Sequence, residues 1–239
     1  MIIRTPRLQL HPASIHDLDD WFALDSSPGV LRYLTAAKPS REQVEADLRK
    51  RLAIARLHHG YGWFSFRLDG QFVGRGSIRP SLGDDIFNPE IGIRLRPEVH
   101  GQGLGLEAMT ALVEYGFTTL GISSVVAITM ASNAASRRML ERIGLQEGST
   151  SPLAPGPLPG WERGQVHYRM GLDAWLDRQD DVRQELHDLQ AAALKRRDSA
   201  ELDHLRTVGM KLAALESDGS WVSSSMVRHL ASDVLPQKG

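Results

Sequence analysis

A run of alternating glycines is the feature of this sequence with the clearest chemical meaning. Residues 100–105 read His-Gly-Gln-Gly-Leu-Gly, between a predicted strand over residues 90–95 and a predicted helix with apolar residues from Leu106 to Phe117. Glycine lets the backbone turn sharply and approach a ligand without a Cβ clash. The loop amides then point into one concavity at the positive end of the helix dipole, which is typical of a phosphate site. Taken alone, the loop also fits a tight strand–helix turn without a ligand.

Two common nucleotide-binding patterns do not fit this loop. It lacks the Lys-Ser/Thr pair that follows the glycines of a Walker loop, which argues against ATP and GTP. A dinucleotide fingerprint needs Gly-x-Gly-x-x-Gly, whereas Gly103-Leu-Gly105 is followed by Leu-Glu-Ala108. The loop also falls in mid-chain after a predicted hairpin, so dinucleotide binding is a poor fit.

The elements around the loop predict an α/β domain with a mixed sheet. Apolar patterns predict strands over residues 7–11, 62–68, 72–78, 90–95, 125–129 and 166–170. Asp69-Gly70 is a hairpin signal, and the continuous apolar run at 125–129 indicates a strand buried on both faces. Further helices are predicted behind Ser14, behind Ser40 and from about Ala134 to Gly144; the second has a buried side lined by Val44, Leu48, Leu52 and Leu57. Residues 152–160 contain four prolines and are predicted to form a surface loop.

The composition changes after Gly171, which divides the chain into a domain over residues 1–171 and a helical extension over residues 172–239. Capping signals predict a helix from Asp173 to about Arg197, a second behind Asp198-Ser-Ala-Glu201, and a third behind Ser223 or Ser224 that includes Val234. The first helix carries an apolar stripe of Trp175, Val182, Leu186, Leu189 and Ala193. These stripes need a surface to cover, and either packing within the chain or a homodimer through the C-terminal helices fits.

Composition excludes several function classes. The 239 residues carry 28 Lys and Arg against 29 Asp and Glu, so the chain is not a broadly basic nucleic-acid binder. It has no cysteine, which excludes disulfides, thiolate metal sites and a cysteine nucleophile. No apolar run approaches the roughly 20 residues that span a bilayer, and no signal peptide is apparent, so we expect a cytoplasmic protein without a membrane partner.

The glycine loop, the strand before it and the segment Asn133–Gly144 together resemble the GNAT acetyltransferases. The resemblance is closest to the branch that acetylates the N-termini of ribosomal proteins and related small amines. The family pattern is Arg/Gln-x-x-Gly-x-Gly/Ala, and only its first position departs here, where His100 stands. The segments Thr5–Leu10 and Arg96–Glu98 also look like this branch. The resemblance covers roughly residues 3–171 and implies a GNAT-like, mostly antiparallel mixed sheet flanked by helices.

This resemblance implies acetyl-CoA as the acyl donor, with no metal. The loop amides would bind the pyrophosphate, and the strand before the loop would pair with the pantetheine amides. His100, Arg137 and Arg138 would contact the CoA phosphates, with a solvated helix face as the alternative for the two arginines. Asn133 would hydrogen-bond the pantetheine arm or serve only as a helix cap. The implied cofactor-binding residues are Ile93, Arg94, Leu95, His100, Gly101, Gln102, Gly103, Leu104, Gly105, Leu106, Asn133 and Arg138.

The resemblance also assigns the catalytic roles. A backbone N–H near Leu95 would stabilise the thioester oxyanion. Glu90 is our candidate general base, with an ion pair to an arginine as the alternative. Many family members use a Tyr at the position of Leu140 to protonate the leaving thiolate; here Ser136 matches the Ser of the ribosomal-protein branch.

The implied function is transfer of an acetyl group from acetyl-CoA to a primary amine, directly and within a ternary complex. The acceptor is a protein N-terminus or a small amine. A non-catalytic acyl-CoA-binding or interaction module is the alternative, because the Tyr is missing and His100 departs from the family pattern. Four aromatic residues either line an acceptor groove or belong to the core: Trp21, Trp63, Phe64 and Phe66. Asp84 and Asp85 either bind a cationic amine or are ordinary turn residues.

Overall fold

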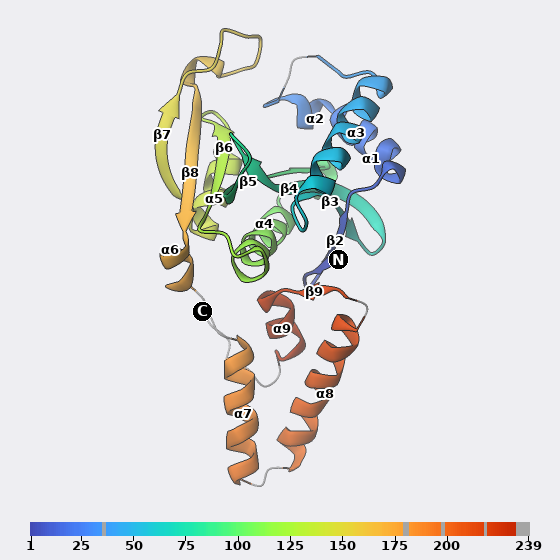
Figure 1. The fold of residues 1–239 in the computed structure, drawn as a ribbon, viewed down its shortest axis with the longest axis vertical. Coiled ribbons are helices and arrows are strands. Elements are labelled where there is room, and N and C mark those ends of the chain that lie inside the picture. Colours follow the sequence, from blue (N-terminus) through green and yellow to red (C-terminus); the bar gives the residue numbers. More distant parts are fainter. Residues whose placement is uncertain (35–36, 179–181, 197–198, 218, 233–239) are drawn as a thin grey trace.

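The computed structural model describes residues 1–34, 37–178, 182–196, 199–217 and 219–232. Within these residues the chain forms a nine-stranded sheet in the order β7-β8-β6-β5-β4-β3-β2-β1-β9 (Figure 1). Neighbouring strands are antiparallel, except that β5 and β6 are parallel and so are β1 and β9. The predicted α/β class, with a mixed, mostly antiparallel sheet flanked by helices and a C-terminal helical appendage, is confirmed.

The strands are β1 Ile3–Arg4, β2 Leu8–Pro12, β3 Gly62–Leu68, β4 Gln71–Ser81, β5 Asp85–Leu95, β6 Ser124–Met130, β7 Gln146–Ser151, β8 Gln165–Gly171 and β9 Trp221–Val222. The α-helices are α1 Leu18–Asp25, α2 Pro28–Leu31, α3 Arg41–Leu57, α4 Leu104–Tyr115, α5 Ala134–Ile143, α6 Leu172–Leu176, α7 Val182–Arg196, α8 Ser199–Glu216 and α9 Ser224–Leu230. A π-helical segment, Gly116–Leu120, continues α4.

Local signals account for several of these boundaries. Asp69 and Gly70 have φ values of 49° and 78° and close the β3–β4 hairpin in the left-handed region that such turns require. Ser40 caps α3: its hydroxyl accepts from the Gln43 amide, and its own amide donates to the Gln43 side chain at 2.7 Å. Gly144, with φ of 100°, ends α5.

Different helices cover the two faces of the sheet. α4 packs against β2, β4 and β5, and the core beneath it includes Phe66 and Leu112. α1 and α3 pack against β4 and β3 on the opposite face, where Trp21 and Leu48 are fully buried. Side chains alternate along each strand, so β4 and β5 present one set of residues to α4 and another to α1.

Some predicted features differ from the structure. β7 was not predicted because Gln-Glu-Gly-Ser-Thr-Ser has no apolar alternation and lies at the sheet edge. β1 and β9 are two residues long and too short to leave a pattern. Leu57, predicted on the buried side of its helix, is 78% exposed because it stands in the last turn of α3, beyond the sheet. Ile128 is exposed although the rest of its strand is mostly buried, because it faces the cavity described below.

The C-terminal extension packs mainly on itself. α7 and α8 form an αα-hairpin, which α9 contacts. Their apolar side chains make a separate small core of Ala193, Leu205, Val208, Leu212, Val222, Val227 and Ala231. The predicted helix over residues 173–197 is two helices, α6 and α7. The side chains of Val182 and Leu186, and residues Asp198 and Val234, lie outside what the structure describes.

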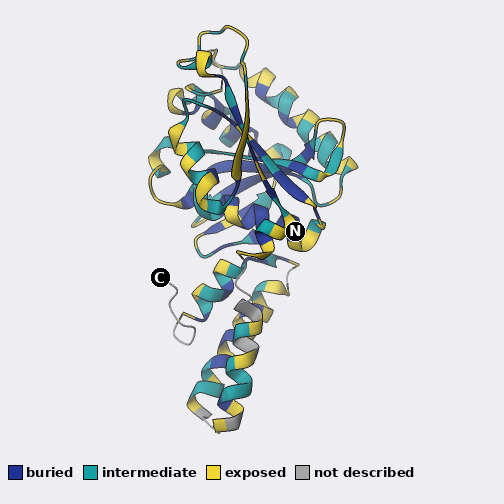
Figure 2. Cartoon of the chain, turned by 90° about the vertical axis from the view of Figure 1, so that its left-hand side faces the viewer, coloured by how far each residue is buried: buried dark blue, intermediate teal, exposed yellow. Residues whose placement is uncertain are grey.

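The extension contacts the rest of the chain through β9, Ser224 and α6. β9 pairs with β1, where Trp221 lies opposite Ile3, and the Ser224 amide donates to the Glu114 carboxylate at 2.9 Å. Trp175 of α6 stacks on Phe117 with 4.9 Å between ring centroids. The hairpin projects from the end of the molecule opposite the loop over residues 152–160 (Figures 1 and 2). The division of the chain at residue 171 stays a prediction.

Candidate acetyl-transfer site

β5 and β6 diverge at the centre of the sheet. Their parallel pairing is limited, within the described residues, to Glu90 opposite Val126. β5 continues to Leu95 while keeping its other edge paired with β4, with Ile93 opposite Gly76 and Leu95 opposite Gly74. Backbone N–H and C=O groups on the β6 side of residues 91–95 therefore face an opening where an extended ligand can add as a strand.

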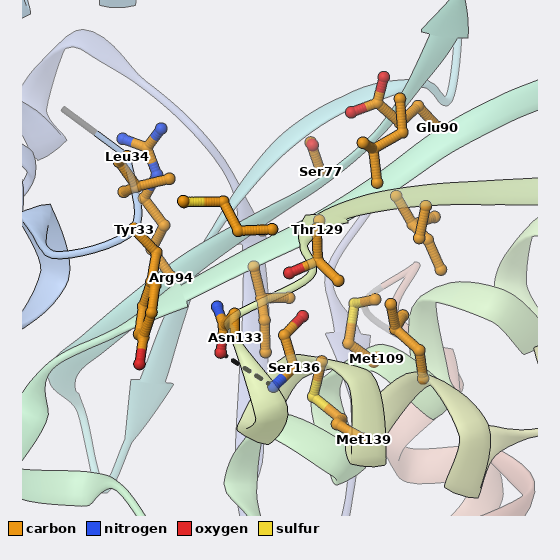
Figure 3. Close-up of a pocket in the computed structure, with 18 of the residues that line it drawn as sticks. Tyr33, Leu34, Ser77, Glu90, Arg94, Met109, Thr129, Asn133, Ser136 and Met139 are labelled. Atoms are coloured by element: carbon orange, nitrogen blue, oxygen red, sulfur yellow. Dashed lines mark hydrogen bonds between the residues drawn. The ribbon is translucent and has the colours of Figure 1, made fainter. Parts of the chain in front are cut away.

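A cavity of about 450 Å³ occupies this opening (Figure 3). Side chains from β4, β5, β6 and α5 form its walls, and the chain around Tyr33 and the proline loop contribute its rim. Five predicted site residues line it: Glu90, Ile93, Arg94, Asn133 and Ser136. Leu95, the last residue of β5, and residues 100–106 are not among the residues that line the cavity.

The glycine loop has the backbone that its sequence predicts. Gly101 and Gly103 have φ values of 76° and 78°, and Gly103 is the residue that caps the start of α4. A Cβ on Gly105 would lie 3.2 Å from the Ile93 Cδ1 atom, so glycine allows α4 to approach β5 closely. Residues 101–103 are exposed, which leaves their amides open to a ligand at the positive end of the helix.

Arg7 holds the glycine loop, a role that sequence analysis did not assign. Its guanidinium donates to the Gln102 carbonyl at 2.9 Å and pairs with the Glu107 carboxylate at 2.6 Å. Glu107 also accepts from the Arg7 amide and the Thr5 hydroxyl. The N-terminal Thr-Pro-Arg segment thus joins β1 and β2 to the first turn of α4. In the sequence, the segment Thr5–Leu10 could be recognised as resembling the family, but the resemblance does not say what Arg7 binds.

His100 bonds to the protein itself. Its Nε2 atom lies 3.1 Å from the Leu95 carbonyl oxygen and ties the loop to the end of β5. Arg138 is exposed on α5 and lies outside the cavity lining. Its neighbour Arg137 donates to the Tyr168 hydroxyl and to the Glu147 carboxylate, and these bonds raise its pKa.

Asn133 and Ser136 lie together at the start of α5. The Asn133 Oδ1 atom accepts from the Ser136 amide at 3.2 Å, so Asn133 caps the helix while its amide group borders the cavity (Figure 3). Leu140, which stands where many relatives have Tyr, is buried and lines the same cavity. Thr129 of β6 borders it close to Ser136.

Glu90 lies at the far end of the cavity from Tyr33, Leu34 and Arg94 (Figure 3). Its carboxylate accepts from the Arg79 guanidinium at 2.6 Å, and both side chains are partly exposed to the cavity. The arginine pairing that was the alternative for this residue is therefore present, in a position that also faces the cavity.

Most of the acidic and aromatic residues considered for binding the acceptor do not line the cavity. Asp85 caps its own turn by accepting from the Phe87 and Asn88 amides, and neither Asp84 nor Asp85 lines the cavity. Trp63 lines it, with the Arg51 guanidinium 5.0 Å from its ring centroid. The other candidate aromatics are buried in the core: Trp21, Phe64 and Phe66.

Among the described residues, no group of three or more His, Cys, Asp and Glu side chains is placed to hold a metal ion. In the same part of the chain, no helix is both long enough and apolar enough to cross a membrane.

Comparisons with known proteins agree with this geometry. Residues 7–146 match the family model described as "Acetyltransferase (GNAT) domain". An FsC-acetyl coenzyme A-N(2)-transacetylase from Aspergillus fumigatus is 30% identical over 185 residues, which are 73% of this chain and 77% of the relative.

Solved structures share the fold. A GNAT-family acetyltransferase from Bacillus anthracis aligns with a TM-score of 0.61 at 20% identity, over 72% of this chain and 98% of that one. The ribosomal L7/L12 α-N-protein acetyltransferase RimL, in complex with coenzyme A, aligns with a TM-score of 0.63 at 19% identity, over 73% and 99%.

Proposed function

The chain belongs to the GNAT family and is an acetyl-CoA-dependent N-acetyltransferase, and on that premise we propose that it transfers the acetyl group directly to a primary amine in a ternary complex. The observation that carries this proposal is the divergence of β5 and β6 at Glu90, with the cavity filling the opening. Such an opening lets donor and acceptor approach one thioester carbon from opposite sides of the sheet.

The donor side is formed by the glycine loop and β5. We assign the amides of residues 101–106 to the pyrophosphate and the backbone edge of residues 93–95 that faces the opening to the pantetheine arm. A backbone N–H near Leu95 then stabilises the thioester oxygen as it becomes an oxyanion. Asn133 hydrogen-bonds the arm through the amide group that borders the cavity, while Arg138 and His100 lie near the phosphates.

The acceptor side carries the proton transfers. The neutral amine nitrogen attacks the thioester carbon, the C–S bond breaks, and the product is an amide with coenzyme A. Glu90 takes the proton from the amine directly or through one water. The departing sulfur gains a proton, and Ser136 donates a hydrogen bond to it because Leu140 has no polar group. The acceptor is a protein N-terminus or a small amine, the two classes that the names of RimL and the N(2)-transacetylase represent.

Coenzyme A release from acetyl-CoA, measured with a panel of N-terminal peptides and small amines, tests the proposal. We expect turnover with at least one acceptor and no covalent acetyl-enzyme, since the chain has no cysteine and no Ser–His–acid set is evident. After incubation with labelled acetyl-CoA and denaturation, the protein should carry no label on an active-site residue. Acetyl-CoA binding without turnover on any acceptor would instead favour a non-catalytic module. A stoichiometric label that passes to an acceptor would disprove direct transfer.

The variant Glu90→Gln separates a catalytic role of this residue from a structural one. We expect kcat to fall about 10²-fold, with acetyl-CoA affinity unchanged. Arg79→Met is the matched control, because it breaks the same ion pair but keeps the carboxylate. Equal losses in both variants would show that the ion pair acts only structurally.

A further inference from the structure

Two arginines on the cavity wall share one carboxylate. Asp25, the last residue of α1, is buried, and both of its oxygens accept from the Arg75 Nη2 atom at 2.9 and 2.6 Å. The Arg94 Nη1 atom donates to the same carboxylate at 3.0 Å. Arg75 on β4 and Arg94 on β5 are cross-strand partners, so they lie on the same face of the sheet, the face that α1 covers.

The other arginines of the cavity each have a carboxylate partner. Arg79 pairs with Glu90, and Arg51 pairs with Asp47 one helical turn away. Asp25 has a single negative charge to set against two guanidinium groups. The wall around Arg94 therefore has an excess positive charge beside the position where the thioester is expected.

Arg75 is incompletely paired despite its burial. Only 3% of the residue is exposed, its guanidinium lies 3.9 Å from the Trp21 ring centroid, and its Nη1 atom has no hydrogen-bond partner within the described residues. Burial lowers the pKa of Arg75 to about 9, because Asp25 offsets only part of the desolvation and the Arg94 charge adds to it. A buried donor without an acceptor is costly unless a ligand or water supplies one.

Arg94 is placed to meet a ligand. About a third of its side chain is exposed, at 32%, and it lines the cavity beside Tyr33 and Leu34 (Figure 3). One of its terminal nitrogens donates to Asp25, which restrains the guanidinium. A guanidinium binds carboxylates through paired hydrogen bonds, more strongly than a neutral donor does.

Resting on the proposed function, we propose that the acceptor carries a carboxylate close to its reacting amine and that Arg94, positioned by Asp25 and Arg75, binds this carboxylate. The acceptor is then an amino acid or a peptide with an acidic residue at its N-terminal end. A polyamine or an aminoglycoside, which brings only positive charge, meets an unfavourable wall. The amine then lies between the side chains of Arg94 and Glu90, whose backbone positions are four residues or about 13 Å apart along β5.

Matched acceptor pairs test this proposal in the full chain. One pair is a set of amino acids and their amides, and the other is a set of peptides that begin with Asp and with Asn. For the carboxylate member of the relevant pair, we expect a kcat/KM at least tenfold higher than for its neutral partner. Arg94→Met should raise the KM for the carboxylate acceptor about 10- to 100-fold and abolish the preference. A preference within the amino-acid pair indicates a small-molecule acceptor, and a preference within the peptide pair indicates a peptide acceptor.

Arg49→Met is the control for loss of charge alone. Arg49 lies on α3, 64% exposed and paired with Glu45, and it does not line the cavity. It should keep the preference of the parent chain. Equal turnover of both members of each pair, or an Arg94→Met variant that loses activity equally on both, would overturn the carboxylate assignment.

Calorimetry with the coenzyme A-loaded protein makes the outcome independent of turnover. Carboxylate acceptors should bind at least tenfold more tightly than their neutral partners, and Arg94→Met should remove the difference. If selective binding occurs but no amine is acetylated, the proposed function fails and the carboxylate site stands. If amines are acetylated without selectivity, the carboxylate site fails and the proposed function stands.

Discussion

Gly103→Val is expected to abolish measurable acetyl-CoA binding while the protein stays folded. Gly103 has a φ of 78° at the start of α4, where the loop amides are exposed. Its added Cβ would lie 3.5 Å from the nearest protein atom, the Arg7 Nη2, which is an ordinary contact distance, and we expect the new side chain to block the position of the pyrophosphate. Loss of several charge-assisted amide contacts should weaken affinity at least 10²-fold, measured by calorimetry.

Backbone strain needs its own control, because any L-residue is strained at this φ. Gly70 has the same φ of 78° in the β3–β4 hairpin, and a Cβ there would meet nothing within 4 Å. Gly70→Val should therefore cost a similar amount of stability, about 1–2 kcal/mol, and leave acetyl-CoA binding intact. Unchanged affinity in a folded Gly103→Val protein would refute the assignment of the loop to the pyrophosphate.

The sequence predicts those parts of the fold where local chemistry and periodicity agree. The Asp69-Gly70 turn, the Ser40–Gln43 cap and the glycine that ends α5 are each determined by a few neighbouring residues. β7 could not be predicted, because a polar edge strand is held by its ladder with β8 and not by an apolar pattern. The β1–β9 pair could not be predicted either, since it joins residues more than 200 positions apart.

The site likewise contains residues that the sequence predicts and partners that it does not. The glycine loop, Asn133 and Ser136 are recognisable from residue types at fixed spacing, and the structure brings the last two together with Glu90 around one cavity. The partners of these residues depend on tertiary contacts. Arg7 meets Gln102, and Asp25 meets Arg75 and Arg94, across sequence separations of 50 residues or more. Nothing near Asp25 in the sequence indicates that it binds two arginines.

Removal of residues 172–239 is expected to destabilise the acetyltransferase domain by several kcal/mol and to lower its solubility. Phe117 would lose its stacked partner Trp175, and the Tyr115 ring would lose Trp221, whose centroid lies 5.9 Å away. The buried Glu114 carboxylate would lose the Ser224 amide and hydroxyl that donate to it. Removal of β9 would also open the β1 edge to other chains. Thermal unfolding and light scattering measure these effects.

A second truncation, after Asp177, tells these contributions apart. It keeps α6 and the Trp175–Phe117 stack but still removes β9 and Ser224. It should be more stable than the truncation after Gly171 by about 3 kcal/mol, the usual cost of losing a buried tryptophan.

Both truncated chains should bind acetyl-CoA with the affinity of the full chain, because no residue beyond Gln165 lines the cavity in the part of the chain that is described. Light scattering also tests a homodimer through the extension: the full chain would have the mass of a dimer and the truncated chain that of a monomer. A truncated chain with unchanged stability, unchanged kinetics and the oligomeric state of the full chain would show that the extension neither completes the core nor joins subunits.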